Sequence, residues 1–166
     1  MYADFEYYQN EYGGNVFKSA EERKRHAKKA GRILDTYTLG KLEFAFPTDK
    51  KTIEAIKDCE CELSEFVYQV EMYLNTAAEG MGYIEQDDGK VRGKIVKSES
   101  SGSESVTYTG VDNTANTVIS KAAQDKKIRT VYEYGVVKED LTGLKDVNGV
   151  MLLYAGDYPG SKSVWE

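Results

Sequence analysis

The sequence predicts a mainly α fold: a small helical domain built on one long central helix, with a β-hairpin insertion and an extended C-terminal tail. Three observations predict it. Apolar residues recur every three or four positions in residues 19–80 and again in residues 114–143. A block rich in Ser, Thr and β-branched residues lies between them, at 91–110. No internal repeat and no linker interrupts the chain, so we expect residues 1–166 to form a single domain.

The first expected element is a short helix within residues 1–14. Asp4 precedes an aromatic-rich run and is a suitable N-cap, because its carboxylate can accept a backbone N–H of the first turn. The pair Gly13-Gly14 is expected to end the helix. We therefore predict a helix over residues 5–12.

A second helix is expected to begin at Ser19-Ala-Glu-Glu22. This is a capping box, in which the serine hydroxyl accepts the third backbone N–H and Glu22 reaches back to the Ser19 N–H. Apolar residues then recur at helical spacing from Ala27 to Tyr37, while Lys and Arg cover the other face. The helix is predicted to end near residues 37–40.

The long central helix is the strongest element in the sequence. Pro47 breaks the chain before it, and Thr48 or Asp49 is the expected N-cap. Its length of about 30 residues corresponds to roughly 45 Å at 1.5 Å per residue. Its apolar stripe comprises Ile53, Ile56, Cys59, Leu63, Phe66, Val67, Val70, Tyr73 and Leu74.

Beyond residue 80 the composition changes to Gly, Ser, Thr and Asp. The β-prone segments Lys94–Lys97 and Ser105–Thr109 flank the Ser-rich residues 98–103, which predicts a β-hairpin over 91–110. A disordered insertion is the alternative that we leave open.

The remaining residues predict a third helical region over 114–143, interrupted at Gly135. Lys145–Gly149 contains Asn-Gly and predicts a turn. Val150–Ala155 then reads as a short strand or as the start of an extended tail over residues 150–166.

The net charge of the chain is −6, but positive and negative residues are unevenly distributed along it. Residues 18–51 hold ten Lys or Arg against five Asp or Glu, whereas residues 52–88 hold one Lys against ten Asp or Glu. Such segments can pair two helices within a monomer, or they can orient neighbouring subunits, because complementary charge registers partners. An acidic protein is a poor candidate for gripping nucleic acid through its phosphates.

We expect neither a signal peptide nor a membrane helix. The start of the chain lacks a basic segment followed by an apolar one. The longest apolar run, Val150–Ala155, has six residues, far short of the ~20 that span a bilayer.

The sequence predicts a protein that is not an enzyme, with no catalytic residue, no metal site and no cofactor. The single histidine, His26, lies among five Lys and Arg residues, so we expect a solvated position on the helix. Cys59 and Cys61 point about 200° apart on a helix, so we expect them to be reduced, unable to bond each other and half-buried. No zinc, calcium or nucleotide motif is complete.

The order of the elements resembles the head–tail connector (adaptor) proteins of tailed bacteriophages, of the kind found in phages and prophages of Gram-positive bacteria. Each motif is short, and the resemblance lies in their order along most of the chain. The segments that carry it are Tyr2–Tyr8 with Glu11–Gly14, Ala27–Tyr37, Ile56–Tyr68, Lys94–Thr109, and Leu141–Gly143 with Gly149–Gly156.

The resemblance implies a structural virion protein in the phage neck, assembled in the bacterial host cytoplasm. Members of that family form a homo-oligomeric ring, usually of twelve subunits, that binds the portal protein. The ring extends the DNA channel and provides the platform for the stopper or tail-completion protein. DNA passes through the lumen without sequence-specific binding.

The aromatic residues near the two ends are the candidate interface residues. Large aromatics on short terminal segments are typical anchors for a partner's pocket. The candidates are Tyr2, Phe5, Tyr7, Tyr8, Tyr12, Tyr154, Tyr158 and Trp165. The alternative is that both ends fold back on their own domain.

Two other functions stay open at this point. One is a different neck protein, such as a stopper or a tail-completion protein, for which a β-barrel core would be expected. The other is an acidic inhibitor or regulator that binds a host protein or mimics DNA. The long helix at 49–79 disfavours the first, and the basic segment 18–51 disfavours the second.

Overall fold

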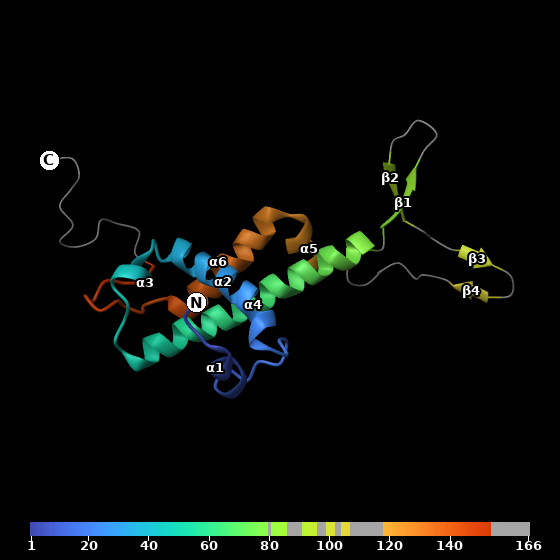
Figure 1. Ribbon diagram of the computed structural model, residues 1–166. Helices are drawn as coiled ribbons and strands as arrows, with labels where there is room; N and C mark the ends of the chain where they lie inside the picture. Colours follow the sequence, from blue (N-terminus) through green and yellow to red (C-terminus); the bar gives the residue numbers. More distant parts are fainter. Residues whose placement is uncertain (80, 86–90, 96–98, 102–103, 107–117, 154–166) are drawn as a thin grey trace. The chain divides into compact units, whose positions relative to one another are not determined.

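A computed structural model describes residues 1–79, 81–85, 91–95, 99–101, 104–106 and 118–153. The protein is mainly helical, as predicted (Figure 1). The helices are α1 (Phe5–Asn10), α2 (Ala20–Tyr37), α3 (Lys41–Phe44), α4 (Lys50–Glu79), α5 (Val118–Gln124) and α6 (Lys126–Leu141). The strands are β1 (Met81–Glu85), β2 (Val91–Ile95), β3 (Glu99–Ser101) and β4 (Glu104–Val106).

The chain divides into two compact units, which we describe separately. Unit 1 comprises Met1–Tyr68 and Thr130–Glu166, and unit 2 comprises Gln69–Arg129. Helices α4 and α6 each begin in one unit and end in the other.

The helix starts follow the predicted caps. The Asp4 carboxylate accepts the Tyr7 N–H at 2.8 Å, which fixes the start of α1. The Ser19 hydroxyl accepts the Glu22 N–H at 3.2 Å. The return bond of the predicted capping box is different, because the Glu22 carboxylate accepts the N–H of Lys18 at 2.9 Å. Half of the predicted motif is therefore present.

The start of α4 is capped by Asp49, the second of the two predicted candidates. Its carboxylate oxygen Oδ2 accepts both the N–H and the hydroxyl of Thr52, each at 3.0 Å. These bonds lower the pKa of Asp49. Between α2 and α4 the sequence failed to predict α3, a single turn that follows Gly40.

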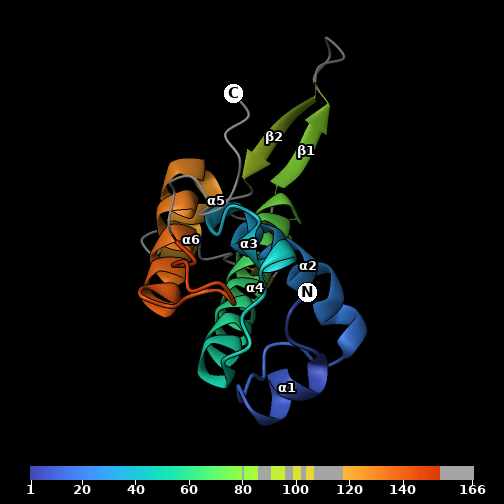
Figure 2. The same cartoon turned by 90° about the vertical axis from the view of Figure 1, so that its left-hand side faces the viewer.

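The core of unit 1 lies where α2, α4 and α6 pack together, as the rotated view in Figure 2 shows. Helices α2 and α4 bury most of the apolar stripe that their sequences predict, because burying these side chains stabilises the fold. Helix α6 instead buries Val136, Val137 and Leu141, while Val131 is 71% exposed. The buried set is Ala30, Leu34, Leu42, Ile56, Cys59, Leu63, Val136, Val137, Leu141 and Leu152.

A second buried cluster lies on the opposite face of α4 and joins it to the N-terminal residues. Ala3, Tyr8, Phe17 and Cys61 form this cluster. Cys59 belongs to the first cluster and Cys61 to the second, as expected for residues about 200° apart. The prediction of half-buried cysteines was wrong, because α4 is covered on both faces and both thiols are fully buried.

The third helical region breaks ten residues earlier than predicted. Asp125 separates α5 from α6, and its carboxylate caps α6 by accepting the Lys127 N–H at 2.7 Å. Gly135 lies inside α6 without interrupting it. Residues 114–117 lie outside the described residues. In unit 2, Gln124 Nε2 donates to the Tyr73 hydroxyl at 3.4 Å, which joins α5 to α4.

The hairpin predicted over 91–110 is not supported. Lys94 lies in β2, which pairs antiparallel with the preceding β1 in the register Met81↔Ile95. Strand β4 pairs with β3 in the register Glu99↔Val106. The two strands that we expected to pair with each other, β2 and β4, each pair instead with the strand that precedes them in the sequence. A shorter loop costs less entropy to close.

The predicted turn at Lys145–Gly149 is present. The Asp146 carboxylate accepts the N–H groups of Asn148 and Val150 at 2.8 and 2.9 Å. Gly149 has φ +79°, and Lys145 bridges to Met151 across the turn. The extended tail lies outside the described residues from position 154 onward.

Candidate assembly surfaces

A buried ion pair holds the N-terminal residues on unit 1. Glu60, in the middle of α4, is fully buried. Its two carboxylate oxygens accept the N–H groups of Tyr2 at 2.8 Å and Ala3 at 2.7 Å. Arg23 of α2 places Nη2 at 3.5 Å from the same carboxylate, and its Nη1 donates to the Ala3 carbonyl at 2.8 Å. Two helices and the start of the chain therefore share one charged centre.

Sequence reasoning missed this centre. Glu60 lies between Cys59 and Cys61, which point to opposite apolar clusters. A carboxylate between two buried neighbours on a helix is the only signal that could have indicated it. An isolated charge would be costly to bury, but here the guanidinium and two backbone N–H groups satisfy it.

The N-terminal tyrosines bind carboxylates of their own subunit. The Tyr2 hydroxyl donates to Asp35 of α2. The Tyr7 hydroxyl donates to Asp58 at 2.8 Å. The Tyr8 hydroxyl donates to Glu65 at 2.6 Å and accepts the Val16 N–H at 2.9 Å. All three tyrosine hydroxyls therefore donate hydrogen bonds within the subunit.

These contacts shift the tyrosine pKa values upward. Burial and then the bond to Glu65 raise the pKa of Tyr8 to about 12, against the opposing effect of the Val16 and Phe17 N–H groups. The pKa values of Tyr2 and Tyr7 are raised by burial and by their bonds to Asp35 and Asp58.

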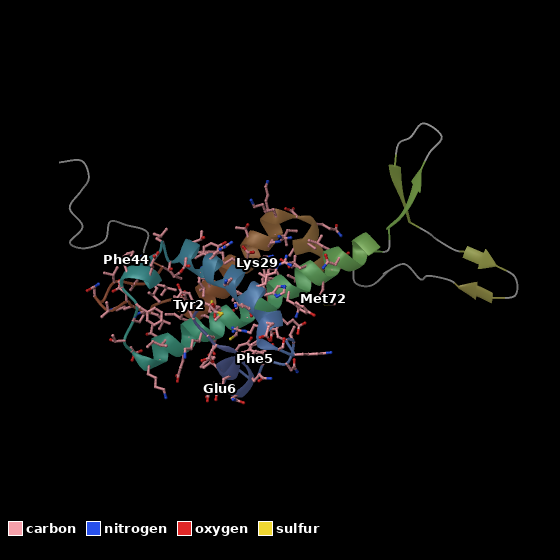
Figure 3. All side chains as sticks on the ribbon, viewed as in Figure 1. Tyr2, Phe5, Glu6, Lys29, Phe44 and Met72 are labelled. Carbon is pink, nitrogen blue, oxygen red and sulfur yellow. The ribbon has the colours of Figure 1, made fainter. Side chains whose placement is uncertain are left out.

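The five N-terminal interface candidates differ in how far they are buried in their own unit. Tyr8 is fully buried within its own unit, and its assignment to an interface between subunits stays a prediction. The segment folds back on its own unit because Glu60 and the tyrosine–carboxylate bonds hold it there. Figure 3 labels Tyr2 and Phe5 on this segment. The half-buried candidates, which keep part of each ring accessible, are Tyr2, Phe5, Tyr7 and Tyr12.

The C-terminal candidates are not placed by the structure. Tyr154, Tyr158 and Trp165 lie outside the described residues. Their role in an interface stays a prediction.

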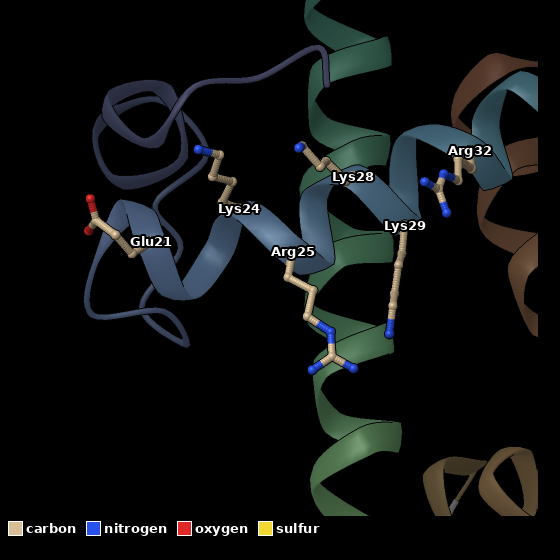
Figure 4. Close-up of a pocket in the computed structure, with 6 residues that line it drawn as sticks. All are labelled: Glu21, Lys24, Arg25, Lys28, Lys29 and Arg32. Atoms are coloured by element: carbon tan, nitrogen blue, oxygen red, sulfur yellow. The ribbon is translucent and has the colours of Figure 1, made fainter.

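The outer side of α2 forms a basic surface, which we define as Lys24, Arg25, Lys28, Lys29 and Arg32. Together with Glu21 these side chains line a shallow groove of about 390 Å³. Figure 4 shows them projecting from successive turns of the helix. All but the half-buried Lys29 are exposed. This side of α2 therefore carries a row of positive charge.

Helices α4 and α6 bring five carboxylates near one another, which we define as the acidic surface: Asp58, Glu62, Glu65, Glu139 and Asp140. Glu139 is exposed and the other four are half-buried. Burial, followed by the charges of Asp140, Glu139 and Glu65, raises the pKa of Glu62. Burial, Glu139 and Asp58 raise the pKa of Asp140, against the lowering effect of a bond with the Cys59 thiol. The carboxylates are close enough to repel one another.

His26 is buried, and the prediction of a solvated position was wrong. Its Nδ1 lies 3.0 Å from the Glu22 carbonyl oxygen. Its ring stacks on Phe17 with centroids 5.6 Å apart and meets Tyr68 edge-on at 5.2 Å. Lys24, Arg25 and Lys28 do lie on the solvated face of α2, but His26 faces inward, as the buried Arg23 also does.

The two thiols are poor nucleophiles at neutral pH. Burial raises the pKa of Cys61 to about 12, although Arg23 opposes the shift. Burial and the nearby Asp140 raise the pKa of Cys59. A thiol must ionise to attack or to bind metal, so neither position favours covalent chemistry.

Among the residues that the structure describes, no three His, Cys, Asp or Glu side chains are grouped as a metal ion would require. In the same part of the chain, none of the helices combines the length and the apolar character needed to cross a membrane.

Comparison with known proteins adds no assignment to this geometry. No protein-family model matches the chain, and no curated protein and no solved structure shows a significant similarity to it.

Proposed function

We propose that this chain is a ring-forming adaptor of a bacteriophage neck, a structural virion protein that binds the portal. In this role it extends the DNA channel and provides the platform for the stopper or tail. It acts without catalysis and without a cofactor, and it assembles in the host cytoplasm before joining the virion. The support is the order of sequence segments that resemble connector proteins, together with the charged surfaces of unit 1.

The observation that carries the proposal is that one unit presents two surfaces of opposite charge. The basic surface belongs to α2, and the acidic surface belongs to α4 and α6. Because the surfaces differ, contact between them joins subunits head to tail. A head-to-tail contact closes into a ring when the rotation between subunits divides a full turn.

The state of the acidic surface supports the same contact. In the isolated subunit, burial and the negative charges of neighbouring carboxylates raise the pKa values of Glu62 and Asp140. A row of Lys and Arg from a neighbouring subunit would offset that repulsion. Charge complementarity of this kind registers partners and speeds their association.

The alternatives fit the structure less well. A stopper or tail-completion protein with a barrel core is disfavoured by the mainly helical fold. A DNA mimic is disfavoured by the basic surface of α2, since a mimic needs acidic rows over most of its exterior.

Charge reversal tests the head-to-tail contact. One variant carries Lys24→Glu with Lys28→Glu, and the other carries Glu62→Lys with Glu139→Lys. We expect the wild-type protein to form rings by native mass spectrometry and negative-stain microscopy, and we expect neither variant alone to do so. A one-to-one mixture should regain rings in which the two variants alternate. The altered surface of one variant then meets the altered surface of the other, which has the opposite charge, and the two unaltered surfaces meet as in the wild-type protein.

Portal binding is tested separately, by mixing the wild-type protein with a portal ring from the same virus. A stacked complex in class averages is the expected result. A wild-type protein that stays monomeric alone and with the portal contradicts the adaptor function. Rings that survive both charge reversals contradict only the surfaces assigned to the contact.

A further inference from the structure

Three cations of the basic surface have no partner within the part of the chain that the structure describes. Lys24, Lys28 and Arg32 are exposed, and no described residue forms a hydrogen bond or an ion pair with their side chains. The neighbouring Arg23, by contrast, is buried 3.5 Å from Glu60. Clustered charge of one sign raises the local concentration of partners of the opposite sign. The three cations therefore indicate an anionic partner.

The spacing of these cations is regular. Lys24, Lys28 and Arg32 follow one another every four residues, so they lie on one face of α2. At about 1.5 Å per residue the row is about 12 Å long. One strand of a duplex carries a phosphate for every ~3.4 Å of the duplex axis, so about three or four phosphates lie along that length. Figure 4 shows Arg25 and Lys29 projecting to the other side of the helix from Lys24 and Lys28.

The acidic net charge of −6 does not cancel the row on α2. Exposed charges act mainly within the Debye length, which is about 8 Å at physiological salt. Glu21 is one of the six residues that line the groove, and the other five are Lys or Arg. The acidic surface belongs to other helices, α4 and α6. The potential beside α2 is therefore set mainly by these five cations.

The residues around the groove narrow the class of anion. Proteins that bind single strands stack the bases on aromatic side chains, and none of the six residues that line this groove is aromatic. A helix that lies on a membrane inserts an apolar face, but Ala30 and Leu34 of α2 are buried in the core of unit 1. A nucleic-acid duplex requires neither feature, because Lys and Arg contact its phosphates from outside.

We propose that the basic surface of the free subunit binds the phosphate backbone of a nucleic-acid duplex, independently of the base sequence. Lys24, Lys28 and Arg32 supply the contacts with one strand. The head-to-tail contact described above uses Lys24 and Lys28 as well, so a neighbouring subunit and a duplex compete for the same side chains. Duplex binding does not rest on ring formation, because it is a property of a single chain.

Fluorescence anisotropy of a short labelled DNA duplex measures the binding. The protein is diluted until native mass spectrometry detects single chains. If three cations contact phosphates, the affinity should fall about 40-fold between about 50 and 200 mM salt, because the slope of log affinity against log salt is about −0.9 per phosphate. Two duplexes of unrelated sequence should bind equally well. Affinity that does not change with salt would overturn the proposal.

The double variant Lys24→Gln with Lys28→Gln removes two of the three contacts. We expect the salt slope to become shallower by about 2, and we expect the same weakening for both duplexes. Lys50→Gln with Lys51→Gln is the matched control, because it removes the same charge from two exposed lysines at the start of α4. The control should bind DNA as the wild-type protein does. Equal weakening in the two double variants would mean that net charge alone attracts DNA, and it would overturn the proposal.

Acetylation footprinting uses the wild-type chain, so it does not depend on the folding of a variant. An excess of duplex should protect Lys24 and Lys28 from an acetylating reagent, as read by mass spectrometry, and it should leave Lys50 and Lys51 reactive. Equal protection of the two pairs, or protection of neither, contradicts the assignment to α2.

Two other probes separate the duplex from other anions. A single strand of the same length should bind more weakly than the duplex. Vesicles of phosphatidylglycerol and phosphatidylcholine should not bind at the same salt concentration. Tighter binding of the single strand, or binding of the vesicles without binding of the duplex, would overturn the proposal.

Discussion

Arg23 and Glu60 meet inside unit 1 with 3.5 Å between Nη2 and Oε2, and neither side chain is more than 2% exposed. The pair connects α2 to α4 and holds the backbone of Tyr2 and Ala3. The bonds from the Tyr2 and Ala3 N–H groups to Glu60, and from Arg23 Nη1 to the Ala3 carbonyl, offset part of the cost of removing two charges from water, although Arg23 Nε is buried without a hydrogen-bond partner.

We expect Glu60→Ala to lower the free energy of unfolding by about 3–5 kcal/mol, because it leaves the Arg23 guanidinium buried without its counter-charge. Denaturant titration at pH 7 measures the change. Lys50→Ala is the matched control, since it breaks the Lys50–Glu54 pair, which is of the same length but exposed. The free energy of unfolding of the Lys50→Ala control should equal that of the wild-type protein within experimental error. Equal losses in the two variants would contradict the assignment.

The tyrosine–carboxylate bonds predict a loss of stability at alkaline pH. The pKa of Tyr8 is raised from 10.0 to about 12 in the folded protein, so folding favours the protonated phenol. The stabilising contribution is complete below pH 10.0 and is lost as the pH rises through about 12. Unfolding free energies measured from pH 8 upward should fall over that interval.

Tyr8→Phe separates Tyr8 from the other tyrosines. It removes the donor to Glu65, and we expect a loss of about 1.5–3 kcal/mol at pH 7, as for a hydrogen bond to a charged group. The variant should also show a shallower decline than the wild-type protein at alkaline pH. An unchanged decline would mean that Tyr8 does not contribute to it.

Carboxylate crowding predicts that Glu62→Gln stabilises the free subunit at pH 7. The folded-state pKa of Glu62 is raised, so the ionised form opposes folding. Its contribution favours folding below the unfolded pKa and is lost as the pH rises through the folded pKa. The gain of the variant, measured by denaturant titration, should therefore disappear in acid. Glu6→Gln, at an exposed position of α1, is the control and should change nothing.

Both cysteines are predicted to be inert in the folded protein. Their thiols are fully buried and their pKa values are raised. An aromatic disulfide reagent at pH 8 should react only as fast as the protein opens, and it should react with both thiols at once in denaturant. Rapid modification of the native protein at either position would contradict this prediction.

The helices were predictable because their determinants are local. Asp4, Ser19 and Asp49 each cap the helix that follows, through atoms three residues away. The apolar stripe of α4 identified Ile56, Cys59 and Leu63, the residues that α4 contributes to the main core, because helical spacing alone decides which side chains share a face. The opposite directions of Cys59 and Cys61 follow from the same geometry.

Pairing between strands was not predictable in this way. The β-prone residues at 94–97 and 105–109 were recognised, but their partners were not, because β2 has a strand before it and another after it along the chain, and propensity does not say which of them it pairs with. β-propensity indicates which residues form strands, whereas the pairing partner and the register depend on which two strands are joined by a loop that closes between them.

The charged and aromatic contacts of unit 1 were decided only by the tertiary structure. Glu60, His26 and Tyr8 all look like solvent-facing or partner-facing residues in the sequence, and all three are buried. The burial of Glu60 and Tyr8 requires the N-terminal segment to lie against a part of α4 that is more than fifty residues away along the chain. His26 is covered by Phe17 and by Tyr68 of α4. The sequence determines the side of a helix on which a residue lies, but only the folded chain determines what covers that side.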